Sequence, residues 1–234
     1  MMKIIQLIRG DMKQICRDSM LAFYGLAPLL LIIVIRFGEP VAAKMTGVDA
    51  AVYHRLVISF AMLLIPLILG IMSGFILLDE RDDNLIQYFA VTPLSKRGYL
   101  MIRLAFPMLV TLCYGMILLL WESGHPLHLF FALSMITLEA PLYTLLLAAY
   151  ASNKVEGLAL MKGFSLMAFT PAFVFFIPEP WQFFGIITPT YWTAKTYLAG
   201  SHVLLFGGLG IVFHLLMLCG LYRRFILKTD LYSE

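Results

Sequence analysis

Six long apolar runs limit what this chain can fold into, because each is close to the length that crosses a lipid bilayer. A membrane-spanning helix needs about 20 mostly apolar residues to cover roughly 30 Å of hydrocarbon. The runs occupy residues 19–35, 56–78, 104–121, 126–153, about 158–178 and 196–222, the last being helical from about residue 202. Of the 234 residues, 61% are hydrophobic and only 13% are charged, which is not typical of a soluble domain. The sequence predicts an all-α membrane protein with six transmembrane helices.

The lysines and arginines predict the orientation of these helices, because basic residues in short loops stay on the cytoplasmic side. With the N-terminus inside, 13 of the 17 basic residues fall in cytoplasmic segments, and only Arg36, Lys44, Arg55 and Lys195 fall outside. Both termini are therefore expected in the cytoplasm. The net charge of +3 is small and the basic residues are scattered, so the composition does not favour a nucleic-acid partner.

Residues 1–18 form a polar segment before the first apolar run. Apolar residues recur there at helical spacing (Ile4, Ile8, Met12, Ile15), while basic residues line another face (Arg9, Lys13, Arg17). This pattern predicts an N-terminal amphipathic helix in the cytoplasmic interface, followed by a transmembrane domain over residues 19–234. A solvated basic tail that only fixes the orientation is the alternative.

A polar insert, LLDERDDNLIQYFAVTPLSKRGYL, separates the second run from the third. Its acids would occupy the first turn of a short helix, where they interact favourably with the helix dipole, and an apolar face would follow (Leu85, Ile86, Phe89). Pro93 would end this helix and Ser95 would cap the next one. We expect a short cytoplasmic helix over about residues 79–95. Its acidic end and apolar side favour docking on a protein, with a solvated structural turn as the alternative.

The sequence lacks the local motifs of a nucleotide-hydrolysing or metal-dependent enzyme. It contains no GxxxxGK[ST] phosphate loop, no HExxH zinc motif and no GxSxG turn. His125 and His128 are separated by Pro126 and have no third ligand nearby in the sequence, so a polar turn is favoured over a metal site. We expect no catalytic residue, no metal and no cofactor bound by this chain.

Glu139 is the one acid in the middle of a predicted span. A charge at the bilayer centre costs about 2.5–3.5 kcal/mol on insertion scales, so such a residue normally faces the protein interior or water. Two interpretations stay open. In the functional one, Glu139 is a ligand for a cationic substrate or a proton carrier. In the structural one, it is a protonated or hydrogen-bonded residue, or the helix register places it nearer an interface. His214 of the sixth run is a candidate partner.

The segment between the fifth and sixth runs is apolar but interrupted by proline. Pro171, Pro178, Pro180 and Pro189 alternate with aromatic residues (Trp181, Phe183, Phe184, Tyr191, Trp192, Tyr197). It is too apolar for a loop in water and too interrupted for one straight helix. We expect an outer re-entrant hairpin over about residues 178–199, with an aromatic interfacial loop as the alternative.

Together with this topology, the insert resembles the permease subunits of type 2 ABC exporters. Many of those permeases carry an E-R-[DE] element and a T-P-[LV]-S element between their second and third spans. Here the first element is matched by Asp79, Glu80, Arg81 and Asp82, and the second by Thr92, Pro93, Leu94 and Ser95. The span count, inward termini, N-terminal helix and broken outer segment are similar too, and the closest likeness is to small drug- and antibiotic-exporting permeases.

The resemblance implies a multi-pass permease of a bacterial-type cytoplasmic membrane, in contact with membrane lipid and without an ATPase of its own. Its short cytoplasmic helix would be a coupling helix, docked on a separate ATP-binding subunit. Two permeases, identical or homologous, would assemble with two such subunits, which bind ATP and Mg²⁺. The predicted contacts with the ATP-binding subunit are Asp79, Glu80, Arg81, Asp82, Leu85, Phe89, Thr92, Pro93 and Ser95.

The expected cargo is amphiphilic: a drug, an antibiotic, a peptide or a lipid-like molecule. It would pass an apolar cavity walled by the second and fifth spans, and the candidate lining residues are Phe60, Met62, Glu139, Phe169 and Phe173. Two other classes stay open. One is a proton-coupled secondary transporter that uses Glu139, and the other is a membrane scaffold or sensor that transports nothing.

Overall fold

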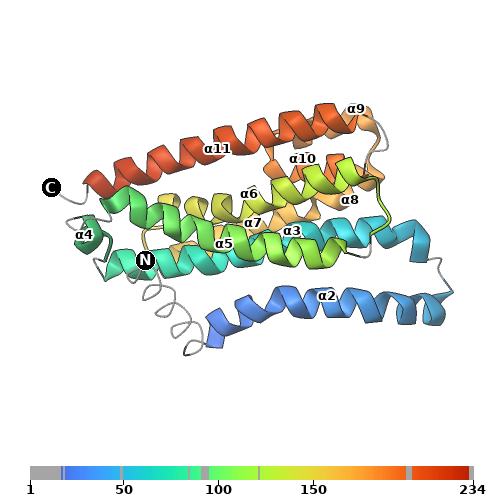
Figure 1. Cartoon of the computed structure of the whole chain (residues 1–234), viewed down its shortest axis with the longest axis horizontal. Coiled ribbons are helices and arrows are strands. Elements are labelled where there is room, and N and C mark those ends of the chain that lie inside the picture. The colour runs from blue at the N-terminus through green and yellow to red at the C-terminus, as the bar shows by residue number, and fades with distance from the viewer. Residues whose placement is uncertain are drawn as a thin grey trace.

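The computed structural model describes residues 17, 19–47, 50–83, 85–90, 95–120, 122–198 and 202–231, so most of the predicted N-terminal helix lies outside it. The described residues form a helical bundle without strands (Figure 1). In chain order the elements are α2 (Ser19–Thr46), α3 (Ala50–Asp82), α4 (Leu85–Ala90), α5 (Ser95–Leu119), α6 (Pro126–Tyr150), α7 (Lys154–Ser165), the 3₁₀ turn η1 (Leu166–Phe169), α8 (Thr170–Phe176), α9 (Glu179–Gln182), the 3₁₀ turn η2 (Phe183–Ile187), α10 (Pro189–Leu198) and α11 (Val203–Leu231).

Six helical stretches in the described residues are long and apolar enough to cross a membrane. They are Leu21–Met45, Tyr53–Asp82, Ser95–Leu119, Pro126–Tyr150, Lys154–Phe176 and Val203–Lys228. The predicted fold class, an all-α protein with six membrane-spanning helices, is therefore confirmed.

Several helices are longer than the apolar runs that predicted them. The first run ends at residue 35, yet α2 continues past Pro40 to Thr46, and α5 begins at Ser95 instead of residue 104. The Ser95 side chain accepts a hydrogen bond from the backbone N–H of Gly98 at 3.3 Å, which confirms the predicted cap. An apolar run marks only the part of a helix suited to hydrocarbon, and backbone hydrogen bonds continue the helix through its polar ends.

The fifth span is not one continuous α-helix. α7 ends at Ser165, η1 follows, and α8 begins at Thr170 with Pro171 in its first turn. Proline is tolerated in a first turn because its missing N–H would have no partner there. The start of the span is fixed by Asn153, whose side chain accepts a hydrogen bond from the backbone N–H of Glu156 at 2.9 Å.

α6 is the central helix of the bundle. It packs against α3, α5, α10 and α11, and most of its second half is buried. α3 approaches it closely at Gly70, where an added Cβ would lie 2.5 Å from the carbonyl oxygen of Ala140. Thr144 Oγ1 donates to the Gly70 carbonyl at 3.1 Å. The missing side chain at Gly70 lets the two backbones meet.

The proline-rich segment before the last span folds into α9, η2 and α10. α10 packs against both α6 and α11 (Figure 1), and all its residues from Pro189 to Tyr197 are buried. Lys195 holds the turn, since its Nζ donates to Glu179 Oε1 and to Gln182 Oε1, each at 2.8 Å. The segment is interrupted, as the sequence predicts; α10 is buried, whereas Trp181 of α9 and Phe184 of η2 are exposed. The depth of the segment in a membrane stays a prediction.

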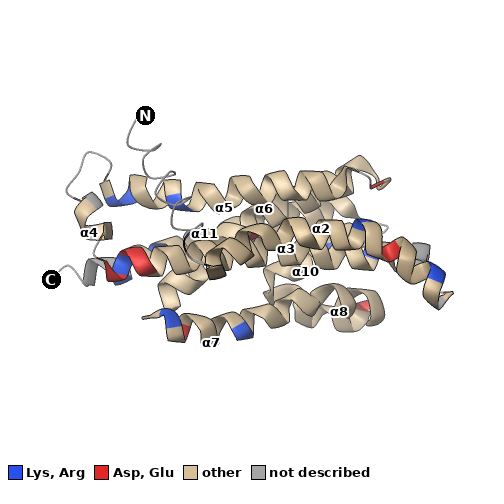
Figure 2. Ribbon diagram, turned by 90° about the horizontal axis from the view of Figure 1, so that it is seen from below, with Lys and Arg blue, Asp and Glu red and all other residues tan. Residues whose placement is uncertain are grey.

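Charged residues gather at the two ends of the bundle, and the length between them is mostly uncharged (Figure 2). The α4 end contains α4, the start of α2, the end of α6 and the end of α11 (Figure 1). The opposite end, called the α9 end, contains α9 and the connections from α2 to α3 and from α5 to α6. This distribution is typical of a bundle whose ends lie at the headgroups and whose length lies in hydrocarbon.

Candidate functional site

The acids of the polar insert end a long helix and do not begin a short one. α3 extends to Asp82, so Asp79 and Glu80 lie in its last turn, and α4 is a separate helix of six residues. Acids in a last turn interact unfavourably with the helix dipole. Cations from other helices offset this effect, because Lys154 Nζ lies 2.8 Å from Asp79 and Arg103 pairs with Glu80.

Glu80 lies inside the protein. Only 6% of it is exposed, it pairs with the Arg103 guanidinium, and it accepts a hydrogen bond from the Tyr99 hydroxyl. Arg103 Nε donates to the same Tyr99 oxygen at 3.3 Å. A buried carboxylate needs such partners. Glu80 is therefore absent from the exposed surface where the sequence placed it, and it joins the end of α3 to the start of α5.

Arg81 and Lys228 close the carbonyl end of α6. Arg81 donates to the backbone oxygens of Ala151 at 3.0 Å and Ser152 at 2.8 Å. Lys228, near the end of α11, donates to the backbone oxygens of Ala149 at 3.1 Å and Ala151 at 3.0 Å. The last carbonyls of a helix have no partner within it, and cations are favourable there. These two side chains tie α3, α6 and α11 together at the α4 end.

α4 exposes part of its surface. Ile86 is buried in the core, whereas 37% of Leu85 and 62% of Tyr88 are exposed. Asp82 and Asp83, just before α4, are exposed as well. Three other predicted contacts lie outside the described side chains: Phe89, Thr92 and Pro93. The described part of the predicted coupling helix thus combines exposed acids with exposed apolar residues.

Glu139 is fully buried in the middle of the bundle. Thr193 Oγ1 donates to its Oε1 at 2.5 Å, and His214 Nε2 lies 3.5 Å from the same oxygen. His214 Nδ1 donates to the carbonyl of Gly210 at 2.6 Å, since a carbonyl can only accept. Nε2 of His214 and Oε2 of Glu139 have no hydrogen-bond partner among the described residues. His214 is thus confirmed as the neighbour, and both interpretations of Glu139 stay open.

The structure brings only some of the predicted lining residues together. Phe60 of α3 and Phe169 of η1 make an edge-to-face contact with ring centroids 6.3 Å apart, and 64% of Phe169 is exposed. Phe173 follows one turn later on α8 and is partly buried. Met62 is 1% exposed and packs in a core cluster with side chains of α2, α5 and α6. The second and fifth spans therefore meet at Phe60 and Phe169, while Met62 lies away from that face.

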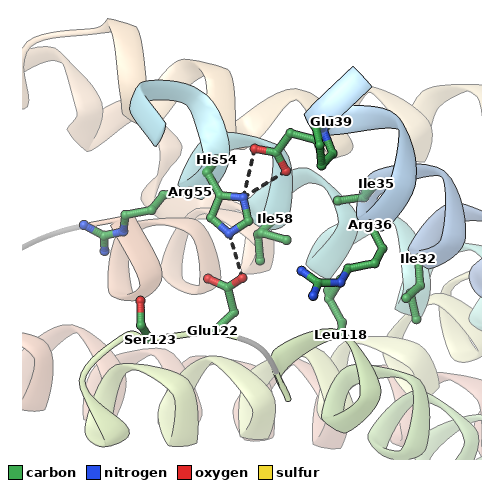
Figure 3. Close-up of a pocket in the computed structure, with 11 residues that line it drawn as sticks. Ile32, Ile35, Arg36, Glu39, His54, Arg55, Ile58, Leu118, Glu122 and Ser123 are labelled. Atoms are coloured by element: carbon green, nitrogen blue, oxygen red, sulfur yellow. Dashed lines mark hydrogen bonds and ion pairs between the residues drawn. The ribbon is translucent and has the colours of Figure 1, made fainter. Parts of the chain in front are cut away.

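A cavity of about 560 Å³ lies at the α9 end, between α2, α3 and the end of α5 (Figure 3). Its apolar wall consists of Ile32, Ile35, Ile58 and Leu118. His54 stands between two carboxylates. Its Nδ1 lies 2.9 Å from both oxygens of Glu39, and its Nε2 lies 2.8 Å from Glu122 Oε1. Arg36 and Arg55 also line the cavity.

The polar groups of this cavity bond mainly to one another. The second oxygen of Glu122 accepts a hydrogen bond from the Tyr197 hydroxyl at 2.8 Å, and Arg55 donates to the Tyr197 carbonyl. Burial, together with the nearby Glu122 carboxylate, raises the pKa of Tyr197, so its hydroxyl stays protonated and donates. We call His54, Glu39, Glu122 and Tyr197 the His54 latch, because it joins α2, α3, the α5–α6 connection and α10.

Sequence reasoning missed the His54 latch, because its members come from four segments. The only local signal is that each charged residue stands near the end of an apolar run. The histidine pair that the sequence did single out has structural roles: His125 Nδ1 accepts from the backbone N–H of Leu127 at 3.3 Å, and His128 bonds to the Thr196 carbonyl at 3.0 Å. Within the described residues, no group of three or more His, Cys, Asp or Glu could hold a metal ion.

Comparisons with known proteins give one consistent result. A family model described as "Fluoroquinolones export permease protein Rv2686c-like" matches residues 11–222. Two Mycobacterium tuberculosis proteins are each 29% identical to this chain, in alignments that cover 94% of this chain and 92% of the relative. They are the fluoroquinolones export permease proteins MT2760, of strain CDC 1551 / Oshkosh, and Rv2686c, of strain ATCC 25618 / H37Rv. No solved structure matches the chain.

Proposed function

Because the chain belongs to the Rv2686c-like family of fluoroquinolones export permeases, we propose that it is the membrane-spanning subunit of an ATP-driven exporter of amphiphilic drugs. The family match over residues 11–222 is the observation that carries the proposal, and six helices of membrane-spanning length agree with it. Since the relatives are named for fluoroquinolones, a fluoroquinolone is the first cargo to test. ATP and Mg²⁺ would be bound by a separate subunit.

The proposed docking surface for that subunit is the exposed part of the α4 end. Asp82 and Asp83 offer negative charge there, and Leu85 and Tyr88 offer apolar area. The 13 basic residues predicted inside favour a cytoplasmic α4 end, in a bacterial-type inner membrane. An exposed surface that is both acidic and apolar suits a protein partner better than anionic lipid.

Glu80 and Arg81 have a different part in this proposal. Glu80 links α3 to Arg103 of α5, and Arg81 links α3 to the end of α6. A displacement of α4 would therefore move α3, α5 and the central helix α6 together. Transport requires that the nucleotide state of the ATP-binding subunits favour one arrangement of these spans over the other.

A second permease copy, identical or homologous, completes the proposed exporter. α2 and α7 meet at one contact, where the Tyr24 hydroxyl donates to the sulfur of Met161 at 3.6 Å. Both expose large apolar side chains, including Val34 of α2 and Val155 of α7. The cargo would pass between the two copies along the face where Phe60 meets Phe169.

The test is co-purification followed by reconstituted efflux. The chain is expressed with a candidate ATP-binding subunit, purified and placed in liposomes loaded with a fluoroquinolone. We expect ATP-dependent efflux, and we expect Asp82→Lys with Leu85→Arg to release the subunit. Lys162→Glu, an exposed charge reversal on α7, is the control that keeps it bound. Efflux that proceeds unchanged without ATP would overturn the proposal.

Proton-coupled transport is kept as a second candidate, because Glu139 and His214 form a buried titratable pair in the centre of the bundle. Fully buried carboxyl groups within a membrane are often part of proton pathways. This function predicts efflux driven by a pH gradient alone, which the same liposomes can test.

A further inference from the structure

An apolar groove of about 710 Å³ runs between α5 and α11 near the α4 end. It belongs neither to the proposed docking surface nor to the proposed cargo path. Both helices pack on α6, and they pack little against each other. The groove is lined by Met101, Leu104, Leu218, Cys219, Tyr222, Ile226 and Leu227. Cys219 and Leu227 are exposed, so the groove opens sideways, toward the surroundings of the bundle.

Two arginines, one from each wall, line the same groove. Arg97 lies in the first turn of α5, and Arg223 lies near the end of α11. Both belong to the ends of membrane-spanning stretches, which is the level of lipid headgroups. The lining thus changes from apolar side chains along its length to guanidinium groups at the α4 end.

These two guanidinium groups differ from their neighbours in having no hydrogen-bond or ion-pair partner among the described side chains. Arg103 and Lys154 pair with acids, Lys228 bonds to backbone carbonyls, and Arg224 stacks at 4.1 Å on the Tyr150 ring. Among the residues that the structure describes, no acidic side chain lines the groove. Two exposed cations without a partner among the described side chains, beside an apolar wall, suit an anion that carries its own apolar part.

We propose that this groove binds an anionic glycerophospholipid, with an acyl chain along the apolar wall and the phosphate between Arg97 and Arg223. Arginine is suited to this contact because its planar fork holds phosphate oxygens with two parallel hydrogen bonds. Basic pockets between membrane-spanning helices are known to select anionic headgroups. The proposal concerns a lipid site and is independent of the cargo.

A second copy of the chain fits this groove less well. In a two-fold symmetric contact the same patch faces itself, which would bring Arg97 and Arg223 of both copies together. The like charges would repel each other without an acid in the lining to neutralise them. Charge complementarity therefore favours the phospholipid as the occupant.

The test measures lipid affinity of the full-length chain in detergent by native mass spectrometry. Phosphatidylglycerol and phosphatidylcholine with the same acyl chains are titrated separately. We expect phosphatidylglycerol to bind more tightly, and each arginine to contribute about fivefold, so that Arg97→Ala with Arg223→Ala weakens its binding about 25-fold. Binding of phosphatidylcholine should change little in the same variant.

The matched control is Arg224→Ala, which removes the same charge one residue later on α11 but outside the groove lining. It should leave the affinity for phosphatidylglycerol within about twofold. Arg97→Lys with Arg223→Lys keeps the charge and should retain most of the binding. Cys219→Trp fills the groove and should weaken both lipids, because it blocks the acyl chain.

Four results would overturn the proposal. They are equal affinity for the two lipids, equal losses in the Arg224 control and the double alanine variant, displacement of the lipid by inorganic phosphate at millimolar concentration, and a cysteine cross-link between Cys219 residues of two copies in lipid bilayers. The last two outcomes would assign the groove to a free anion or to a second copy of the chain.

Discussion

His54 Nε2 lies 2.8 Å from Glu122 Oε1, and the other nitrogen of the same ring lies 2.9 Å from Glu39. A neutral imidazole donates from one nitrogen only, so both contacts are hydrogen bonds at the same time only when the ring carries two protons. One of the two hydrogen bonds of His54 in the latch is therefore present at low pH and lost at high pH.

We expect His54→Phe to lower the free energy of unfolding by about 1 kcal/mol, since the side chain is partly exposed and solvent screens its charge. Melting followed by tryptophan fluorescence should show a larger difference from the wild type at about pH 5 than at about pH 9, where the imidazole has lost its second proton. Lys44→Gln, an exposed residue near the end of α2 at the same end of the bundle, is the control. A difference that grows with pH would contradict the two-donor latch.

Arg103 and Glu80 form a buried pair, so removing one partner should leave an unpaired buried charge. We expect Arg103→Met or Glu80→Met to cost about 3–5 kcal/mol, and the double variant to cost less than either alone. Asp83→Asn, on the exposed surface, should change stability by less than about 0.5 kcal/mol. Denaturation in detergent measures all four. If Glu80→Met melts like the wild type but loses the ATP-binding subunit, Glu80 is a docking residue after all.

Gly70 should not tolerate a side chain. In Gly70→Ala the new Cβ would lie 2.5 Å from the Ala140 carbonyl oxygen, so α3 and α6 must separate, at a cost of about 1–3 kcal/mol. Gly208→Ala is the matched control, because nothing lies within 4 Å of a Cβ there and alanine favours the helix. A melting temperature for Gly70→Ala equal to that of the control would show that the contact is not tight.

Glu139→Gln separates the two transport mechanisms. The Gln side-chain oxygen can still accept the hydrogen bond from Thr193, so we expect the protein to fold and ATP-driven efflux to stay within about twofold of the wild type. If Glu139 carries a proton, the variant should instead lose transport activity, because a glutamine amide does not bind and release a proton at physiological pH. Loss of efflux with an unchanged melting temperature would favour the proton-coupled mechanism.

Glu179 lies outside the membrane-spanning stretches, and its contact with Lys195 can be tested by lowering the pH. The hydrogen bond from Lys195 and its charge lower the pKa of Glu179. A carboxyl group whose pKa is lowered by folding stabilises the protein above its unfolded pKa, and this contribution is lost as the pH falls through the folded pKa. The melting temperatures of the wild type and Glu179→Gln should therefore differ at neutral pH and converge below about pH 4. A difference that persists in acid would rule out the Lys195 contact as its source.

Features that depend on local chemistry could be predicted from the sequence. The six spans follow from hydropathy, and the Ser95 cap follows from the preference of serine for helix starts. His214 could be proposed as a neighbour of Glu139 because a buried carboxyl group needs a polar partner, and few polar residues lie within the spans. The broken segment before α11 follows from its prolines.

Features that depend on distant partners could not be predicted. The dipole rule placed Asp79 and Glu80 at a helix start, but Lys154 and Arg103 let α3 continue through them. The His54 latch joins residues up to 75 positions apart in the chain, and none of its pairs has a local signature. Hydropathy likewise does not separate Met62, which packs inward, from Phe60, which faces the fifth span.

α10 lies against α11, and α11 leaves the ribosome after every other helix in contact with Glu139. Until α11 is made, one side of the carboxyl group lacks its protein cover, and exposure to lipid is costly. The fourth span is therefore expected to be unstable in the bilayer until α11 has been synthesised. A translation product that ends before α11 should remain a substrate for membrane chaperones and proteases, because its Glu139 carboxyl group is incompletely covered.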